Sequence, residues 1–156
     1  MHRKFPLFFD ITDKKIIVYG AGRIATRRVE TLLAFAPSLT VIAPEALEAI
    51  REAEGAGKLT YREACYETGG IPDDAWMVLA ATDDQAVNEA IWRECKQKRI
   101  LVNVCSDRSL CDFQFPGIAF ADELVIGVNA GGTDHRLARR WTEKIQKEVA
   151  EEWKER

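Results

Sequence analysis

Two glycines and an alanine near the start of the chain have the spacing of a dinucleotide-binding turn. Gly20, Gly22 and Ala25 read G-x-G-x-x-A, after an apolar run at residues 16–18 and before an amphipathic helical pattern. The first glycine permits a tight turn, the second lets the backbone approach a pyrophosphate, and the alanine lets the helix pack closely on the strand. The helix N-terminus would bind the pyrophosphate; the alternative is a turn that binds nothing. The expected cofactor contacts here are Gly20, Gly22, Arg23 and Ile24.

The adenosine half of a dinucleotide would lie where the next apolar strand ends, at Ala43, Pro44 and Glu45. An NAD site usually has an acidic residue about 20 positions beyond the glycines, which binds the ribose hydroxyls. Glu45 is the nearest acid, and this segment has no Arg or Lys to hold a 2′-phosphate. The sequence therefore favours NAD over NADP. For Glu45 itself, the favoured interpretation is an acid at the start of a helix, beside the helix dipole.

Polar residues end two later apolar strands, where the nicotinamide half would lie. Thr82 and Asp83 follow the buried run at residues 77–81, and Asn103 lies in the next run. Because ligands bind at the carboxyl ends of parallel strands, we expect these three residues to contact the cofactor. Thr82 is also followed by Gln85 in a capping-box pattern, so a helix cap is the alternative.

The loop at residues 105–112 has groups suited to proton transfer. It follows the last of these strands and contains Asp107. A carboxylate beside a nicotinamide ring accepts a proton as hydride leaves a substrate, a role worth roughly 10²- to 10⁴-fold in rate. On chemistry alone, the loop favours a polar turn whose Asp residues cap a helix or bind local N–H groups. The competing hypothesis is that Asp107 is this base.

A second glycine turn opens the last helix, whose first turns are rich in cations. A helix N-terminus with a threonine cap and several cations suits an anionic substrate. A solvated basic face of an amphipathic helix is an equally good interpretation. The expected substrate contacts are Gly131, Gly132, Thr133, His135, Arg136 and Arg139.

Strands that alternate with helices predict the fold that positions these residues. We expect strands at residues 16–18, 39–43, 59–62, 77–81 and 101–104, with helices from 23, over 45–54 and over 82–98. This order predicts an α/β fold with a Rossmann-type, doubly wound parallel sheet. Short strands at 113–115, 118–120 and 124–128 and a helix from 134 follow. The expected domains are 1–112, which binds NAD, and 113–156, a short strand-and-helix extension for dimerisation and substrate covering.

Composition excludes several classes of protein. Among 156 residues, 22 Lys and Arg against 25 Asp and Glu give a net charge of −3. The chain thus lacks the excess of positive charge that is typical of proteins that bind nucleic acid. No apolar run approaches the roughly 20 residues that span a bilayer, and the first residues do not have the pattern of a signal peptide, so we expect a cytoplasmic protein without membrane contact. The four Cys and two His residues do not have zinc-site spacing, and no metal site is expected.

Segments spread over nearly the whole chain resemble one enzyme family, and they occur in the same order as in that family. The matching segments are FPLFFDITDKKIIVYGAGRIATRRVETLL, VIAPE, LAATDD, ILVNV, LCDFQFPGI and AGGTDHRLARR. With these segments the chain resembles the precorrin-2 dehydrogenase family, the N-terminal domain of siroheme synthases. The resemblance implies a homodimer and NAD-dependent oxidation of precorrin-2, an octacarboxylate tetrapyrrole, to sirohydrochlorin. In some members it also implies insertion of Fe²⁺ or Co²⁺ into the product.

The sequence departs from the family at the residue usually proposed as its catalytic acid. Family members commonly read N-V-V-D after the fifth strand, whereas this chain reads Asn103-Val104-Cys105-Ser106 and has Asp107 one place later. The expected catalytic residues are therefore Asp107 and Ser106. The extension is also shorter than in the family. A sirohydrochlorin ferrochelatase or cobaltochelatase, and a non-catalytic dinucleotide- or tetrapyrrole-binding module, are the alternative functions.

Overall fold

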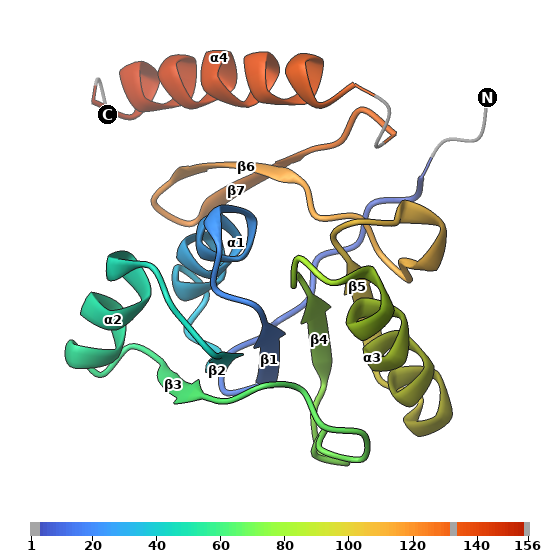
Figure 1. Cartoon of the computed structure of the whole chain (residues 1–156). Coiled ribbons are helices and arrows are strands. Elements are labelled where there is room, and N and C mark those ends of the chain that lie inside the picture. Colours follow the sequence, from blue (N-terminus) through green and yellow to red (C-terminus); the bar gives the residue numbers. More distant parts are fainter. Residues whose placement is uncertain (1–3, 132–133, 155–156) are drawn as a thin grey trace. The chain divides into compact units, whose positions relative to one another are not determined.

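The computed structural model describes residues 4–131 and 134–154 (Figure 1). The chain divides into two compact units. One unit comprises Asp10–Phe113, and the other joins the N-terminal residues up to Phe9 with those from Gln114 onward. The glycine turn and the loop around Asp107 lie in the first unit, and the cation-rich helix lies in the second.

The first unit is built on a five-stranded sheet in the order β3-β2-β1-β4-β5, with every neighbouring pair parallel. From β1 the chain crosses to β2 and β3, and it then returns to β4 on the other side of β1. This reversal places the topological switch point at the carboxyl ends of β1 and β4, where ligands bind in such sheets. The predicted doubly wound α/β fold is confirmed. The strands are β1 (Lys15–Tyr19), β2 (Ser38–Ala43), β3 (Thr60–Glu63), β4 (Met77–Ala80) and β5 (Leu101–Val104).

Three α-helices connect these strands, and two of them begin later than predicted. They are α1 (Arg23–Leu33), α2 (Glu48–Gly55) and α3 (Gln85–Lys98). The carboxylate of Asp84 caps α3 by accepting hydrogen bonds from the N–H groups of Ala86 and Val87. The capping-box prediction at Thr82 is therefore wrong by two residues, because Asp84, and not Thr82, directly precedes the first helical residue and its carboxylate reaches the first free N–H groups.

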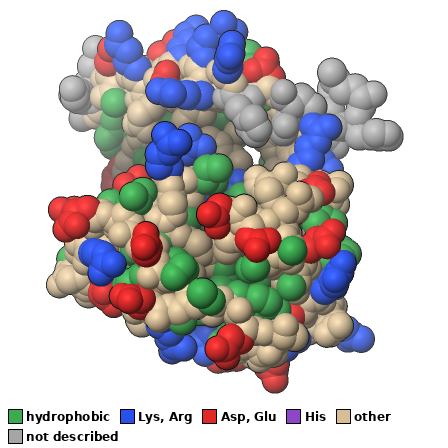
Figure 2. Space-filling view, in the orientation of Figure 1, with side chains coloured by type: hydrophobic (Ala, Val, Ile, Leu, Met, Phe, Trp, Pro, Cys, Tyr) green, Lys and Arg blue, Asp and Glu red, His purple; other side chains and the backbone are tan. Residues whose placement is uncertain are grey.

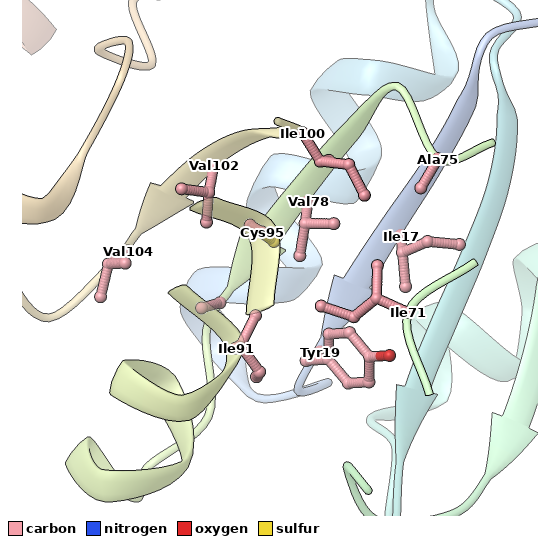
Figure 3. Close-up of a cluster of buried hydrophobic side chains, with 11 residues drawn as sticks. Ile17, Tyr19, Ile71, Ala75, Val78, Ile91, Cys95, Ile100, Val102 and Val104 are labelled. Atoms are coloured by element: carbon pink, nitrogen blue, oxygen red, sulfur yellow. The ribbon is translucent and has the colours of Figure 1, made fainter. Parts of the chain in front are cut away.

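The core beside α3 consists of alternate residues from the central strands. Ile17 and Tyr19 of β1, Val78 of β4 and Ile91 of α3 converge in one cluster (Figure 3). Each has at most 3% of its surface exposed. Burying a side chain of this size contributes roughly 1.5–3 kcal/mol. This packing holds the carboxyl ends of β1 and β4 in a fixed position, so the loops that follow them start from rigid strands.

The second unit is a β-hairpin covered by a helix. Strands β6 (Gly117–Ala121) and β7 (Leu124–Val128) pair antiparallel around a turn at Asp122, and the helix is α4 (His135–Lys154). The Gln146 amide of α4 binds both the N–H and the carbonyl of Phe120, each at 2.9 Å. The strand predicted at residues 113–115 is not formed: the Phe113 carbonyl binds the Asn103 side chain instead of a strand.

Charged side chains cover both units. Figure 2 shows Lys and Arg side chains with acidic ones among them over α4, at the top of the view, and interspersed acidic, basic and apolar side chains over the sheet unit. None of the helices in the described residues is both long enough and apolar enough to cross a membrane.

Candidate dinucleotide site

The turn after β1 needs glycine at its first position. Gly20 has φ +101°, and a Cβ on it would lie 2.3 Å from the carbonyl oxygen of Ala81. Its N–H donates to the Ile42 carbonyl at 2.9 Å, and Ala81 N–H donates to the Tyr19 carbonyl at 2.8 Å. The turn is thus held against the ends of both strands that flank β1, and no larger residue fits there.

Gly22 leaves open the space in front of α1. Its φ of −76° is available to any residue, and a Cβ on it would meet nothing within 4 Å. The advantage of glycine here is therefore room for a ligand rather than backbone conformation. Ala25, 1% exposed, packs the start of the helix inside the unit. The three positions have the geometry that the G-x-G-x-x-A spacing predicts.

Helix α1 begins without a side-chain cap. Gly22 is its N-cap residue, no acidic residue lies in the first turn, and the first intrahelical bond runs from Thr26 N–H to the Gly22 carbonyl at 2.9 Å. The N–H groups of residues 23–25 precede that bond and point out of the helix end, where the dipole favours an anion. Arg23 and Ile24 are exposed beside them. A pyrophosphate fits this helix start.

The end of β2 has an exposed acid that does not belong to a helix. Ala43 is buried, and Pro44 and Glu45 are exposed. Helix α2 starts only at Glu48, with Leu47 as its N-cap. The interpretation of Glu45 as the first acid of a helix is therefore wrong, because Glu48 has that position. Glu45 is free of that role and remains a predicted ligand of ribose hydroxyls.

A buried asparagine connects the loops after β4 and β5. Asn88 of α3 is 1% exposed. Its amide oxygen accepts from Thr82 N–H at 3.1 Å and from the Thr82 hydroxyl at 2.8 Å. Its amide nitrogen donates to the Thr82 carbonyl at 3.0 Å and to Ser106 Oγ at 3.3 Å. Sequence reasoning missed this residue. The signal in the sequence is its helical spacing. Asn88 lies three residues before Ile91 and seven before Cys95, so it shares the buried face of α3 with them.

Asp107 caps the short 3₁₀ helix Arg108–Leu110. One carboxylate oxygen accepts from the Ser109 hydroxyl at 2.6 Å and from the Ser109 N–H at 2.8 Å. These bonds lower the pKa of Asp107, because they stabilise the carboxylate form. The role as a local cap is therefore present in the structure, and the lowered pKa makes Asp107 a weaker base. Neighbouring Ser106 is exposed, and the exposed Asp83 lies in the loop before α3.

Asn103 is occupied by other groups of the protein. It is 3% exposed, its amide nitrogen donates to the Phe113 carbonyl at 2.8 Å, and its amide oxygen accepts from the guanidinium of Arg28. These bonds tie β5 to α1 and to the loop that follows. They use both polar atoms of the side chain, so the geometry does not favour the predicted cofactor contact of Asn103.

Two cysteines flank the Asp107 loop as packed thiols. Cys111 Sγ donates to the Val104 carbonyl and accepts from Val104 N–H, both at 3.2 Å. Burial raises the pKa of Cys111 and of Cys105, so both stay protonated at neutral pH. Across the described part of the chain, no three His, Cys, Asp or Glu side chains are grouped to hold a metal ion.

In the second unit, the start of α4 presents two arginines. Asp134 caps the helix by accepting from Leu137 N–H at 2.8 Å, and with Leu137, Arg136 and Arg140 it lines a surface hollow. Arg140 was not among the predicted contacts. Arg139 is paired with Glu143 at 2.7 Å instead.

The glycine turn before α4 is described only in part. Gly131 has φ +69°, and its N–H donates to the Asn129 side chain at 2.6 Å. The amide nitrogen of Asn129 in turn donates to Gln114 at 2.7 Å. The predicted contacts Gly132 and Thr133, and the side chain of His135, lie outside the described residues.

The parallel sheet, the Gly20 turn at its switch point and the uncapped start of α1 define a Rossmann-type dinucleotide-binding protein. Comparison with known families agrees: the model described as "Putative NAD(P)-binding" matches residues 7–117. The chain belongs to this NAD(P)-binding family.

Curated relatives and a solved structure are similar over most of the chain. It is 40% identical to "Siroheme synthase" of Nitrosospira multiformis over 138 residues, 86% of this chain and 29% of the relative. It is 36% identical to "Probable multifunctional siroheme biosynthesis protein HemA" of Ruminiclostridium josui over 148 residues, 94% of this chain and 28% of the relative. The chain thus spans less than a third of these relatives. The structure of "SirC, precorrin-2 dehydrogenase" matches with TM-score 0.75 and 26% identity, covering 93% of this chain and 71% of that one.

Proposed function

We propose that this chain is an NAD-dependent dehydrogenase that oxidises precorrin-2 to sirohydrochlorin in siroheme biosynthesis. The observation that carries the proposal is the open, uncapped start of α1 behind Gly20. Likeness to siroheme synthases in sequence and to a precorrin-2 dehydrogenase in structure supports the substrate. The conversion transfers hydride to NAD⁺ and releases a proton, so precorrin-2 and NAD⁺ give sirohydrochlorin, NADH and H⁺.

NAD supplies the hydride acceptor, and the chain supplies its binding and orientation. The N–H groups at the start of α1 bind the pyrophosphate, with Arg23 and Ile24 beside it. Glu45 binds the ribose hydroxyls next to Ala43 and Pro44. An acid at this place repels a 2′-phosphate, so we expect NAD to be preferred to NADP.

The carboxylates of the tetrapyrrole match the cationic start of α4. Arg136 and Arg140 line the hollow there and present guanidinium groups, which bind carboxylates with two parallel hydrogen bonds. The remaining predicted contacts are Gly131, Gly132, Thr133, His135 and Arg139. We also propose that the protein works as a homodimer in the cytoplasm.

The deciding experiment follows absorbance of the purified protein with enzymatically generated precorrin-2 and either NAD or NADP. We expect NADH and sirohydrochlorin to form in equal amounts, with a kcat/KM for NAD at least about tenfold above that for NADP. Binding of NAD without turnover would contradict the dehydrogenase and leave a binding module. Product formed from sirohydrochlorin only when Co²⁺ is added would identify a chelatase instead.

Asp107 is the proposed base, and Asp107→Asn tests it while keeping an oxygen that can accept the Ser109 bonds. If Asp107 accepts the proton, we expect kcat to fall about 10²-fold or more, with the NAD dissociation constant within about twofold of wild type. Asp122→Asn, at the β6–β7 turn, is the matched control. An unchanged kcat for Asp107→Asn would reduce Asp107 to the helix cap that the structure shows.

A further inference from the structure

The orientation of the Asn88 amide is determined by backbone groups. Thr82 N–H can only donate, so it identifies the amide oxygen of Asn88, 3.1 Å away. The Thr82 carbonyl can only accept, so it identifies the amide nitrogen, 3.0 Å away. The remaining N–H of that nitrogen points to Ser106 Oγ at 3.3 Å. The buried Asn88 thus determines which of the Thr82 and Ser106 hydroxyls donates a hydrogen bond to it and which accepts one from it.

The two hydroxyls present opposite hydrogen-bonding groups. Thr82 donates its proton to Asn88 at 2.8 Å and shares it with the Asp84 carbonyl at 3.0 Å, so the Thr82 oxygen keeps its lone pairs for a ligand. Ser106 Oγ accepts from Asn88, so its own proton is left to donate. Thr82 is half-buried and Ser106 is exposed, so a ligand can reach both.

These hydroxyls lie together at the carboxyl edge of the sheet. Ala80 of β4 and Val104 of β5 are register partners, and Thr82 and Ser106 each lie two residues further on. This edge adjoins the switch point between β1 and β4, beside the Gly20 turn. The pair therefore offers an acceptor and a donor side by side, within reach of a dinucleotide bound to that turn.

We propose that Thr82 and Ser106, oriented by Asn88, bind the carboxamide of the nicotinamide ring. The amide NH₂ donates to Thr82 Oγ1, and the amide carbonyl accepts from the Ser106 hydroxyl. This inference rests on the proposed use of NAD. It adds which side chains hold the nicotinamide ring in its orientation. Asn88 touches neither partner of the reaction and is a positioning residue.

A cofactor analogue tests the proposal through binding, without turnover. In 3-acetylpyridine adenine dinucleotide a methyl group replaces the NH₂ and the carbonyl is kept. By isothermal titration calorimetry, we expect the wild-type protein to bind NAD about 3- to 10-fold more tightly than the analogue. Thr82→Val should reduce this ratio to about 1, and Thr82→Ser should restore it. Thr60→Val, on exposed β3, is the matched control and should keep the wild-type ratio.

Ser106→Ala should give the opposite pattern. Because both dinucleotides keep the carbonyl, we expect both to bind about 3- to 10-fold more weakly while their ratio stays at the wild-type value. Ser109→Ala, whose hydroxyl contacts Asp107 rather than Asn88, is its control.

Each outcome decides the proposal. A wild-type ratio in Thr82→Val, in a protein that still binds NAD and oxidises precorrin-2, would overturn the carboxamide site alone. A wild-type protein that binds neither dinucleotide would overturn the proposed function and this site together.

Discussion

Replacing Gly20 with alanine is expected to destabilise the sheet unit by about 3 kcal/mol or more. The added Cβ would lie 2.3 Å from the Ala81 carbonyl oxygen and 2.7 Å from its carbonyl carbon, and both are backbone atoms that cannot rotate away. The φ of +101° is also unfavourable for any residue with a Cβ. Urea denaturation followed by tryptophan fluorescence measures the loss.

The matched control is the second glycine of the same turn. Gly22→Ala adds the same methyl group where nothing lies within 4 Å and φ is −76°. We expect the free energy of unfolding to stay within about 1 kcal/mol of wild type. The dissociation constant of NAD should rise at least about tenfold, because the methyl group takes the space of the pyrophosphate. Wild-type stability of Gly20→Ala would contradict the turn geometry, and unchanged NAD affinity of Gly22→Ala would contradict the pyrophosphate site.

The second large effect is expected at Glu94, a buried carboxylate in α3. Glu94 is 5% exposed and accepts hydrogen bonds from Tyr66 at 2.7 Å, Gly69 N–H at 2.9 Å and Ile71 N–H at 3.0 Å. It also pairs with Lys98 at 3.0 Å. One side chain thus holds residues 66–71 of the connection between β3 and β4. We expect Glu94→Ala to lower the free energy of unfolding by about 3 kcal/mol, because these donors lose their partner inside the protein.

Glu89→Ala is the control for this variant. Glu89 lies on the same helix and pairs with Arg93 at 3.0 Å, but 45% of its side chain is exposed. An exposed pair at this spacing contributes about 0.3–0.5 kcal/mol. Equal losses of stability in the two variants, measured by urea denaturation, would contradict the anchoring role of Glu94.

The same carboxylate makes stability depend on pH. Burial tends to raise the pKa of Glu94, but the bonds from Tyr66, Lys98, Gly69 and Ile71 outweigh it and lower the pKa below the ordinary 4.5. A group with a lowered pKa in the folded state stabilises the protein above its unfolded pKa, and this contribution is lost as the pH falls through the folded pKa. Wild type should therefore lose more stability than Glu94→Gln between about pH 5 and pH 3. Parallel curves for the two proteins would contradict this linkage.

Sequence patterns predicted the sheet well because it depends on local periodicity. The β-branched run before Gly20 and the glycine spacing leave one favourable local structure, and both lie where expected. Residues that act through distant contacts were harder to find. Asn88 and Glu94 look like ordinary polar positions of an amphipathic helix. Their importance comes from loops that the parallel topology brings to them, Thr82 and Ser106 for one and residues 66–71 for the other.

The candidate site was less predictable than the fold for the same reason. From its residue types alone, the polar loop after β5 favoured a local cap over a base at Asp107, and the bonds to Ser109 show that the cap is formed. The helix expected at residue 45 begins at Glu48, since nothing local requires a helix start at either acid. Asn103 was predicted to contact the cofactor, because the sequence does not show that Arg28 and the Phe113 carbonyl bind its amide.

The strand order has a consequence for how the protein is made. The residues of the Gly20 turn all lie within the first 25 positions, yet the turn is held by contacts with distant residues. Ile42 and Ala81 supply its hydrogen bonds, and the Ala81 carbonyl fills the space that a Cβ on Gly20 would need. During synthesis from the N-terminus, the apolar strand β1 therefore leaves the ribosome long before β4, its partner from Met77 onward. Pairings so distant in sequence form slowly, and unpaired apolar strands aggregate. The cofactor turn can therefore first be complete when about residue 81 has emerged, because Ala81 supplies its last contacts.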